Sequence, residues 1–168
     1  MVFPDYREGR LYAEDVPIEK IVEVVETPVY CYSETALQQN YQSYAEHFKP
    51  ESSLICFAVK ANSNLAIIRA LGKMGAGADV VSEGELRRAL LAGIPAEKIV
   101  YSGVAKTPRE MRFALQQDIL QFNVESEPEL ELLNQTALAE GKKAAIAFRI
   151  NPDIDAGTHE KISTGKAS

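Results

Sequence analysis

Short apolar runs alternate with longer segments of helical periodicity along most of the chain. The runs are rich in β-forming residues and occupy 28–33, 53–59, 78–81, 98–102, 119–123 and 143–150. Each of the first five precedes a segment in which apolar residues recur at helical spacing, which predicts a strand followed by a helix. The runs lack a clean alternation of apolar and polar positions, as is typical of strands covered on both faces. This order predicts an α/β fold with a parallel sheet.

We expect a TIM-type (β/α)8 barrel rather than an open doubly wound sheet. The glycines at 72, 75 and 77 precede a strand, whereas the dinucleotide-binding fingerprint of open sheets follows one. These glycines suit a tight turn from helix to strand. A barrel needs eight strands, and the sequence after Ile150 is polar and rich in turn residues, without a closing strand. We therefore expect a partial barrel that is the front part of a longer protein.

The starts and ends of the helices carry their own signals. Ser82 precedes Glu85, and Ser126 precedes Glu129, each in the pattern of a capping box. Gly93 follows an apolar helical segment, where a left-handed residue commonly ends a helix. These signals predict helices that begin at 83 and 127.

Composition narrows the possible functions. The 168 residues are 46% hydrophobic and 25% charged, which is typical of a globular protein. The net charge of -6 and the scattered acidic residues make nucleic acid an unexpected partner. No apolar run is long enough to span a bilayer and the N-terminus does not resemble a signal peptide, so we expect a cytoplasmic protein. Cys31 and Cys56 lack metal-site spacing, and we expect two reduced, buried thiols.

Ligand sites in barrels form at the carboxyl ends of the strands, so polar residues just past each run are candidates. They are Lys60, Asn62, Asp79, Ser82, Ser102, Asn123, Arg149 and Asn151. Most residues at such positions start loops or cap helices. A further signal is therefore needed to single out any of them.

Lys60 stands out because Ala58, Val59 and Ala61 around it are small or apolar. We expect these neighbours to provide surroundings of low dielectric constant, which favour a neutral amine. A neutral amine forms a Schiff base with an aldehyde, so the pattern suits a lysine that holds pyridoxal phosphate. A strand-end lysine that extends to solvent is the more frequent arrangement, and this alternative stays open. Ala58 and Asn62, on either side of Lys60, are candidate supporting residues.

Other charged residues lie near the expected site. Asp79 comes about one strand-helix unit after Lys60, so we expect the two side chains to approach each other and form an ion pair. Glu85 falls on the first turn of the next helix, where a carboxylate complements the helix dipole. Arg149 could bind an anion or pair with an acidic neighbour. His159 lies in loop sequence, and we expect it to face solvent.

Five motifs occur in the order "CFAVKANSN", "GAGADVVSEGEL", "YSGVAKTPREM", "FNVESEPELELL" and "RINPDIDAGTHEKISTG". Together they resemble the N-terminal half of the diaminopimelate decarboxylases, pyridoxal-phosphate enzymes of the alanine racemase-like barrel class. The resemblance extends over nearly the whole chain, from "TPVYCYS" onward. "AVKAN" alone would suggest only the wider class, which includes ornithine and arginine decarboxylases. "NPDIDAGTHEKISTG" points to the diaminopimelate branch.

The resemblance implies that Lys60 forms the Schiff base with pyridoxal 5'-phosphate. It also implies that Asp79 and Arg149 lie at the cofactor and that Glu85 is an acidic neighbour. The barrel would begin with the Lys60 strand, so that residues 34–168 form the first five strand-helix units. Residues 1–33, including the expected strand at 28–33, would pack with a C-terminal β-domain.

The implied activity is the conversion of meso-diaminopimelate to L-lysine and CO2, within lysine biosynthesis, by a homodimer. The resemblance places the ring-stacking histidine, the glycine-rich phosphate loop and the substrate-binding residues of these enzymes beyond residue 168. We therefore expect that the 168 residues alone are not a competent decarboxylase. Two alternatives stay open: a decarboxylase of another basic amino acid such as ornithine or arginine, and a non-catalytic truncated homologue that acts by binding proteins.

Overall fold

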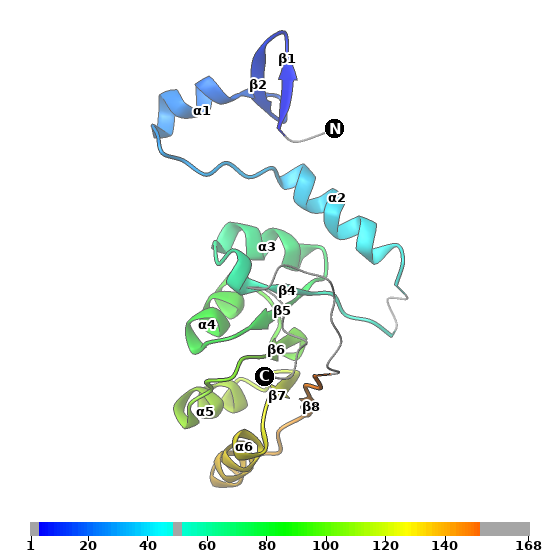
Figure 1. Ribbon diagram of the computed structural model, residues 1–168, viewed down its shortest axis with the longest axis vertical. Helices are drawn as coiled ribbons and strands as arrows, with labels where there is room; N and C mark the ends of the chain where they lie inside the picture. The colour runs from blue at the N-terminus through cyan, green and yellow to red at the C-terminus, as the bar shows by residue number, and fades with distance from the viewer. Residues whose placement is uncertain (1–3, 49–51, 152–168) are drawn as a thin grey trace.

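The centre of the protein is a five-stranded parallel sheet with helices on one side (Figure 1). The computed structural model describes residues 4–48 and 52–151. The strands are β4 (Cys56–Ala58), β5 (Gly77–Val80), β6 (Ile99–Tyr101), β7 (Gln121–Val124) and β8 (Ile146–Phe148). The connecting helices are α3 (Leu65–Lys73), α4 (Glu83–Ala92), α5 (Pro108–Gln116) and α6 (Glu127–Ala139).

The strands lie in the order of the sequence, from β4 to β8, and each pairs in parallel with the next. An open doubly wound sheet would reverse direction from its middle and place helices on both faces. Sequential order with the helices on one side is the arrangement of a (β/α) barrel. The predicted α/β fold and the partial barrel are therefore confirmed. Each of the last five predicted runs overlaps one of these strands, although β5 begins one residue before its run and β7 ends one residue after its run.

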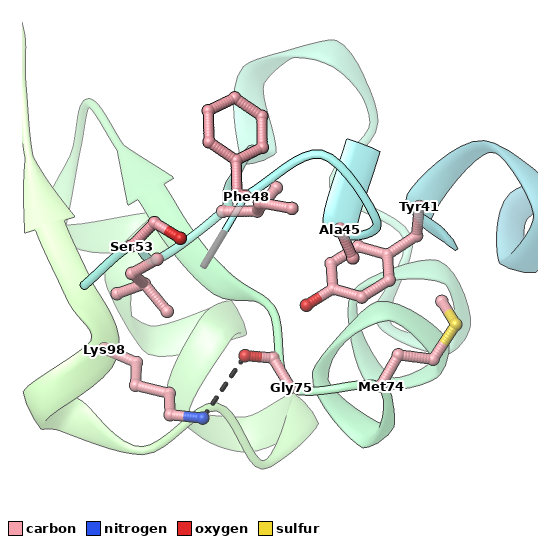
Figure 2. Close-up of a pocket in the computed structure, with 9 residues that line it drawn as sticks. Tyr41, Ala45, Phe48, Ser53, Met74, Gly75 and Lys98 are labelled. Atoms are coloured by element: carbon pink, nitrogen blue, oxygen red, sulfur yellow. Dashed lines mark hydrogen bonds between the residues drawn. The ribbon is translucent and has the colours of Figure 1, made fainter. Parts of the chain in front are cut away.

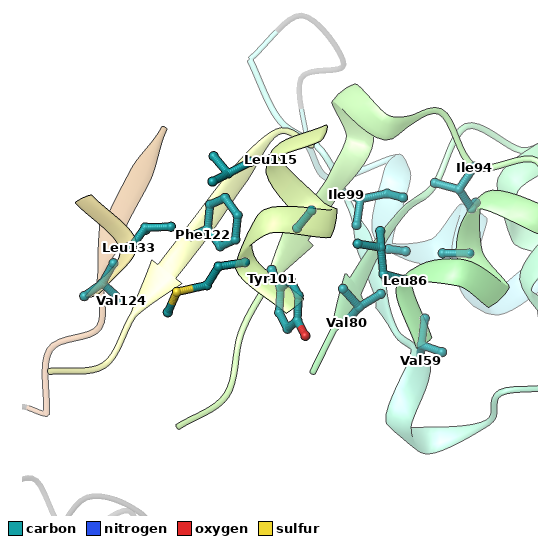
Figure 3. Packing of buried hydrophobic residues seen from close by; sticks show 14 of the residues in the cluster. Val59, Val80, Leu86, Ile94, Ile99, Tyr101, Leu115, Phe122, Val124 and Leu133 are labelled. Carbon is teal, nitrogen blue, oxygen red and sulfur yellow. The ribbon is translucent and has the colours of Figure 1, made fainter. Parts of the chain in front are cut away.

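The hydrophobic core lies between the sheet and the helices. Alternate strand residues point into this layer, among them Val80, Tyr101 and Phe122, which are fully buried (Figure 3). Helix residues such as Leu86 and Leu133 meet them from the other side. Burying one such side chain contributes roughly 1.5–3 kcal/mol. Because strand side chains alternate, the residues between these positions face the barrel interior.

The N-terminal part of the chain departs from the prediction. It forms a small antiparallel sheet of β1 (Asp5–Arg7), β2 (Arg10–Ala13) and β3 (Val16–Pro17), followed by helix α1 (Ile18–Val25). The predicted strand at 28–33 is wrong, because this segment has no regular secondary structure and pairs with no described strand. A β-rich segment becomes a strand only where a neighbour supplies hydrogen bonds. Here Tyr30 is 88% exposed and Tyr32 is 51% exposed.

Helix α2 (Glu34–Ala45) is connected to the N-terminal sheet through its first turn. The Ser33 hydroxyl accepts a hydrogen bond from the backbone of Ala36 and donates one of 2.6 Å to the Glu14 carboxylate. Glu14 also accepts a bond from the backbone N–H of Thr35. Hydrogen bonds from Ser33 and from Thr35 keep the pKa of Glu14 below its usual value. A carboxylate thus caps a helix that lies 19 residues further along the chain.

The predicted helix starts are confirmed, with one difference in geometry. Ser82 and Ser126 cap α4 and α6 by accepting the N–H groups of Glu85 and Glu129. The Glu85 carboxylate does not return to Ser82; it accepts the N–H of Val81, one residue earlier. Gly93 ends α4 at a φ of 94°, as predicted.

Glycine at position 77 is required by packing. A Cβ atom there would lie 2.2 Å from the carbonyl oxygen of Lys98 and 2.9 Å from the Cys56 sulfur. Gly75, at a φ of 101°, makes the turn from α3 into β5. The predicted turn between helix and strand is therefore confirmed at Gly75, whereas Gly72 lies within α3 and Gly77 is the first residue of β5.

The two cysteines are free, as predicted, but each is half-buried rather than buried. Burial raises the pKa of the Cys56 thiol, and the charge of Asp79 raises it further. Cys56 and Asp79 thus share the interior side of the sheet. Among the described residues, no helix combines the length and the apolar character needed to cross a membrane.

Candidate functional site

The carboxyl ends of the strands carry a chain of hydrogen bonds on the interior side of the sheet. The Gln121 amide donates to the Asn123 side-chain oxygen at 2.9 Å, and the Asn123 amide donates to the Ser102 hydroxyl at 2.9 Å. Ser102 in turn donates to the Asp79 carboxylate at 2.6 Å. All three hydrogen bonds run in the same direction, from Gln121 through Asn123 and Ser102 to Asp79. In such a chain each hydrogen bond polarises the next and strengthens it. The carboxylate of Asp79 is therefore held in place from β6 and β7.

Lys60 lies in the short 3-10 turn Val59–Ala61 that directly follows β4. Its side chain is exposed, so the expected surroundings of low dielectric constant are absent from the described part of the chain. The turn lifts Lys60 past the strand end while Val59, beside it, is fully buried in the core. The backbone thus anchors the turn through Val59 and leaves the lysine amine at the open edge.

The predicted ion pair between Lys60 and Asp79 is not present. Asp79 pairs in register with Ala58, two residues before the lysine, so the two residues do lie on adjacent strand ends. The Asp79 carboxylate binds Ser102 instead, and none of the ion pairs among residues 4–48 and 52–151 includes Lys60. Lys60 therefore presents an amine that no described side chain occupies.

The candidate supporting residues have structural roles that are visible. Ala58 is the half-buried last residue of β4. Asn62 is half-buried and its side chain accepts the N–H of Asn64, which caps α3. Glu85 lies in the first turn of α4 and is engaged with the backbone of Val81. These residues shape the turns on either side of the Lys60 edge.

Arg149 follows β8 and pairs with Glu125, which follows β7. The guanidinium Nη1 lies 3.1 and 3.3 Å from the two carboxylate oxygens. Glu125 also accepts the N–H of Gly103 at 3.0 Å, and its side chain is only 8% exposed. Together with Ser102, Asn123 and Phe148, the pair lines an open hollow of about 360 Å³. The structure thus brings Arg149 to the edge that also carries Asp79, whereas His159 lies outside the described residues.

Lys106 is a buried residue of this edge that the sequence interpretation missed. Its ammonium donates to the carbonyl oxygens of Gly103 at 2.6 Å and Asn123 at 2.8 Å, and to the Glu129 carboxylate at 2.7 Å. The side chains of Lys106 and Glu129 are 1% and 7% exposed. Lys106 also follows small or apolar residues in "GVAK". The signal that singled out Lys60 was therefore present at Lys106 as well.

A second hollow, of about 320 Å³, lies at the amino-terminal end of the sheet (Figure 2). It is lined by Tyr41 and Ala45 of α2, and by Met74, Gly75 and Lys98 before the strands. Lys98 donates to the carbonyl oxygen of Gly75 at 3.2 Å. This end of a barrel serves stability rather than catalysis. The candidate site is therefore the carboxyl edge.

Comparison with known proteins identifies the family. Residues 34–168 match the family described as "Pyridoxal-dependent decarboxylase, pyridoxal binding domain". The chain belongs to this family. The match covers all the parallel strands described above.

Several proteins that are 40–50% identical to the chain are named as diaminopimelate decarboxylases. It is 48% identical over 161 residues to the diaminopimelate decarboxylase of Aquifex aeolicus, covering 96% of this chain and 38% of that protein. The diaminopimelate decarboxylase of Helicobacter pylori, solved with L-lysine, has a TM-score of 0.85 at 48% identity, over 89% of this chain and 38% of that one. The diaminopimelate decarboxylase of M. jannaschii, also solved with L-lysine, has a TM-score of 0.87 at 43% identity. The match covers 96% of this chain and 39% of that one. The chain thus spans well under half of these proteins.

The side chains at the carboxyl edge fit the pyridoxal phosphate of this family. The aldehyde of that cofactor needs a primary amine, and Lys60 presents one without a described partner. Its anionic oxygens need cationic or N–H donors, and Arg149 supplies a guanidinium of which only Nη1 is engaged by described residues. Lys106 does not fit the first role, because three acceptors already take its three N–H donors. The donor set at this edge therefore fits the cofactor.

Proposed function

We propose that this chain is the Lys60-bearing part of a decarboxylase that converts meso-diaminopimelate to L-lysine and CO2. The observation that carries the proposal is the exposed Lys60 amine at the carboxyl edge, next to an Asp79 carboxylate that is fixed by Ser102. Membership of the pyridoxal-dependent decarboxylases supports the reaction class. The names of the similar enzymes support the substrate.

Lys60 would hold the cofactor through its aldehyde carbon, and the 3-10 turn Val59–Ala61 places the amine at the carboxyl edge of the sheet. When bound, pyridoxal phosphate supplies the electron-poor ring that accepts the electron pair left behind as CO2 departs. The Lys60 side chain is exposed, so its amine could change position without breaking a buried contact.

Asp79 and Arg149 supply charges of opposite sign at the carboxyl edge of the sheet, Asp79 from β5 and Arg149 from the residue after β8. Asp79 is fixed by the hydrogen bond from Ser102 and offers its second oxygen as an acceptor for a protonated nitrogen. Arg149, held by Glu125, offers its free N–H groups to an anionic oxygen. Glu85 acts one step away, by fixing the backbone of Val81 after β5. This arrangement orients a ligand that carries both charges.

The surroundings of the chain in the whole enzyme are part of the proposal. Residues 1–33 pack with a C-terminal β-domain, and residues 34–168 form the first five units of the barrel. The exposed Tyr30 and Val24, at 88% and 81%, support a covering partner for the N-terminal segment. The enzyme is a homodimer in the cytoplasm.

Assays of the protein at its natural length test the function. We expect release of CO2 and L-lysine from meso-diaminopimelate, and no release from ornithine or arginine. The Lys60→Ala variant should fold but release product only at background rate. Turnover of ornithine or arginine in place of diaminopimelate would favour the alternative substrate class, and an inactive wild type with no bound cofactor would favour the non-catalytic binding protein. We also expect the isolated 168-residue chain to make no lysine; detectable lysine would contradict this.

A further inference from the structure

The buried Lys106 ammonium lies at the centre of contacts that join the ends of β6 and β7 to the first turn of α6. Gly103 follows β6, Asn123 belongs to β7, and Glu129 stands in the first helical turn after β7. Every N–H donor of the ammonium has an oxygen acceptor within 2.8 Å. A lysine held in this way is a fixed cation and not a nucleophile. Any role of Lys106 must therefore come from the residues that its ammonium fixes in place.

The Lys106 contacts continue to Arg149 through two carboxylates. The second oxygen of Glu129 accepts the backbone N–H of Glu125 at 3.3 Å, which fixes the main chain just after β7. The side chain of Glu125 then accepts the N–H of Gly103 and pairs with Arg149. Gly103 thus has its N–H bound to Glu125 and its carbonyl bound to Lys106. The loop after β6, the loop after β7 and Arg149 form one connected unit.

The position of this unit distinguishes it from an ordinary structural ion pair. Lys142 offers a comparison, because it also bridges neighbouring units, donating to the carbonyl of Leu115 and the carboxylate of Asp118. Lys142 lies at the amino-terminal end of the sheet, and Asp118 is 79% exposed. Lys106 lies at the carboxyl edge, where its partner Asn123 also lines the hollow with Arg149. Only the Lys106 contacts connect to the candidate site.

We propose that Lys106 is a positioning residue for the cofactor site, acting through Glu129 and Glu125 to fix the Arg149 guanidinium. Without the ammonium, the Glu129 charge is left buried and unpaired, and the Gly103 and Asn123 carbonyls lose a shared donor. Glu125 then loses its fixed backbone, and Arg149 loses its orientation. Replacing a side chain that orients a metal ligand typically weakens metal binding by about 10–100-fold, and the same reasoning applies to a residue that orients Arg149. This inference rests on the proposed function, because it assumes that the edge binds pyridoxal phosphate.

The test compares Lys106→Met with Lys142→Met in the protein at its natural length. The dissociation constant of pyridoxal 5'-phosphate is measured by titrating the apoprotein, at a temperature where far-ultraviolet circular dichroism shows every variant folded. We expect Lys106→Met to bind the cofactor about tenfold or more weakly. Lys142→Met should stay within about twofold of wild type, because its contacts lie at the other end of the sheet. The visible circular dichroism of the bound cofactor should change in Lys106→Met alone, since it reports cofactor orientation.

Glu125→Gln provides a second test that does not disturb the buried ammonium. The amide keeps the size of the side chain and an acceptor for Gly103, but it loses the charge that pairs with Arg149. We expect Glu125→Gln to weaken cofactor binding as Lys106→Met does. If Lys106→Met fails to fold, the affinity of Glu125→Gln for the cofactor is the test of the inference. The inference is overturned if the folded variants bind and orient the cofactor as Lys142→Met does. A wild type that binds no pyridoxal phosphate overturns the proposed function itself, and this inference with it.

Discussion

Two lysines follow small or apolar neighbours in this sequence, and the fold treats them oppositely. Lys60 stands in a turn whose buried residue is Val59, so its own side chain extends outward. Lys106 bends back under the loop after β6 and is 1% exposed. Apolar neighbours indicate that the backbone is anchored, and they do not decide the direction of the side chain. The exposed lysine suits covalent exchange, whereas the buried one suits the positioning role.

The Ser102 hydroxyl connects Asn123 to Asp79, so its removal should destabilise the protein. Ser102→Ala removes the donor to Asp79 and the acceptor for Asn123, and both groups are half-buried. We expect a loss of roughly 1–3 kcal/mol in the free energy of unfolding, measured by urea denaturation. The control is Ser43→Ala, which removes an exposed bond to the carbonyl of Asn40 and should change stability by less than about 0.5 kcal/mol. Equal losses in the two variants would contradict the role given to the hydrogen-bond chain.

Ion pairs near their N-termini connect the neighbouring helices α4 and α5. Glu83, in the first turn of α4, accepts hydrogen bonds from Arg87 on its own helix and from Arg109 on α5. The Arg87 guanidinium also lies 3.9 Å from the centre of the Phe113 ring on α5. These contacts connect α4 to α5 just outside the carboxyl edge. They hold together the helices that follow Asp79 and Ser102.

The Glu83 contacts predict a dependence of stability on pH. Hydrogen bonds from Arg87, and then from Arg109, hold the pKa of Glu83 below its ordinary value of 4.5. A lowered pKa stabilises the folded state above pH 4.5, and this contribution disappears as the pH falls through the lowered pKa. We expect Glu83→Gln to be less stable than wild type at pH 7 and to lose less stability on acidification. The measurement is urea denaturation from pH 7 down to about pH 3.

Glu127→Gln is the control for this prediction. Glu127 occupies the first turn of α6, as Glu83 does in α4, but it is exposed. This variant should keep the acid dependence of wild type. If the free energy of unfolding of Glu83→Gln depends on pH as that of wild type does, between pH 7 and about pH 3, the Glu83 contacts do not stabilise the fold.

At the scale of the whole molecule, β4 and β8 are the two outer strands of the sheet formed by the described residues. Apolar side chains near β8 are uncovered in the described residues: Phe148 is 65% exposed, Leu138 70% and Ile150 81%. An uncovered edge strand with apolar side chains is a template for association. The same surface is where the next units of a barrel would pack.

We therefore expect the 168-residue chain to self-associate through this edge. Phe148→Lys should shift the sedimentation of the isolated chain toward monomer. The control is Leu91→Lys, because Leu91 is 67% exposed but lies on α4, away from the edge. A monomeric wild-type chain, or an equal shift in both variants, would show that the β8 edge is not the contact.

Local signals explain which parts of the structure could be predicted. The starts of α4 and α6 depend on Ser82 and Ser126 and on residues within one turn of them, so the sequence predicts them directly. The parallel strands follow from apolar runs that recur with helices between them. The strand expected at 28–33 failed because strand formation depends on a partner, which β-propensity does not supply. The N-terminal sheet was missed because its strands are only two to four residues long.

The candidate site was predicted in position but not in its contacts. Lys60, Asp79 and Arg149 do lie at the carboxyl edge, because topology places every strand end there. Their partners come from other strand-helix units: Ser102 for Asp79, and Glu125 for Arg149. The buried Lys106 ammonium is paired with Glu129, which reaches it from α6. Contacts of this kind depend on how units pack, and no spacing within one unit encodes them.

Chemical trapping shows directly whether Lys60 carries the cofactor. The protein at its natural length is loaded with pyridoxal 5'-phosphate, reduced with borohydride, digested and analysed by mass spectrometry. We expect the reduced cofactor on the peptide that contains Lys60, with Lys106 unmodified. A label on Lys106 or on any other lysine, or no label at all, would contradict it.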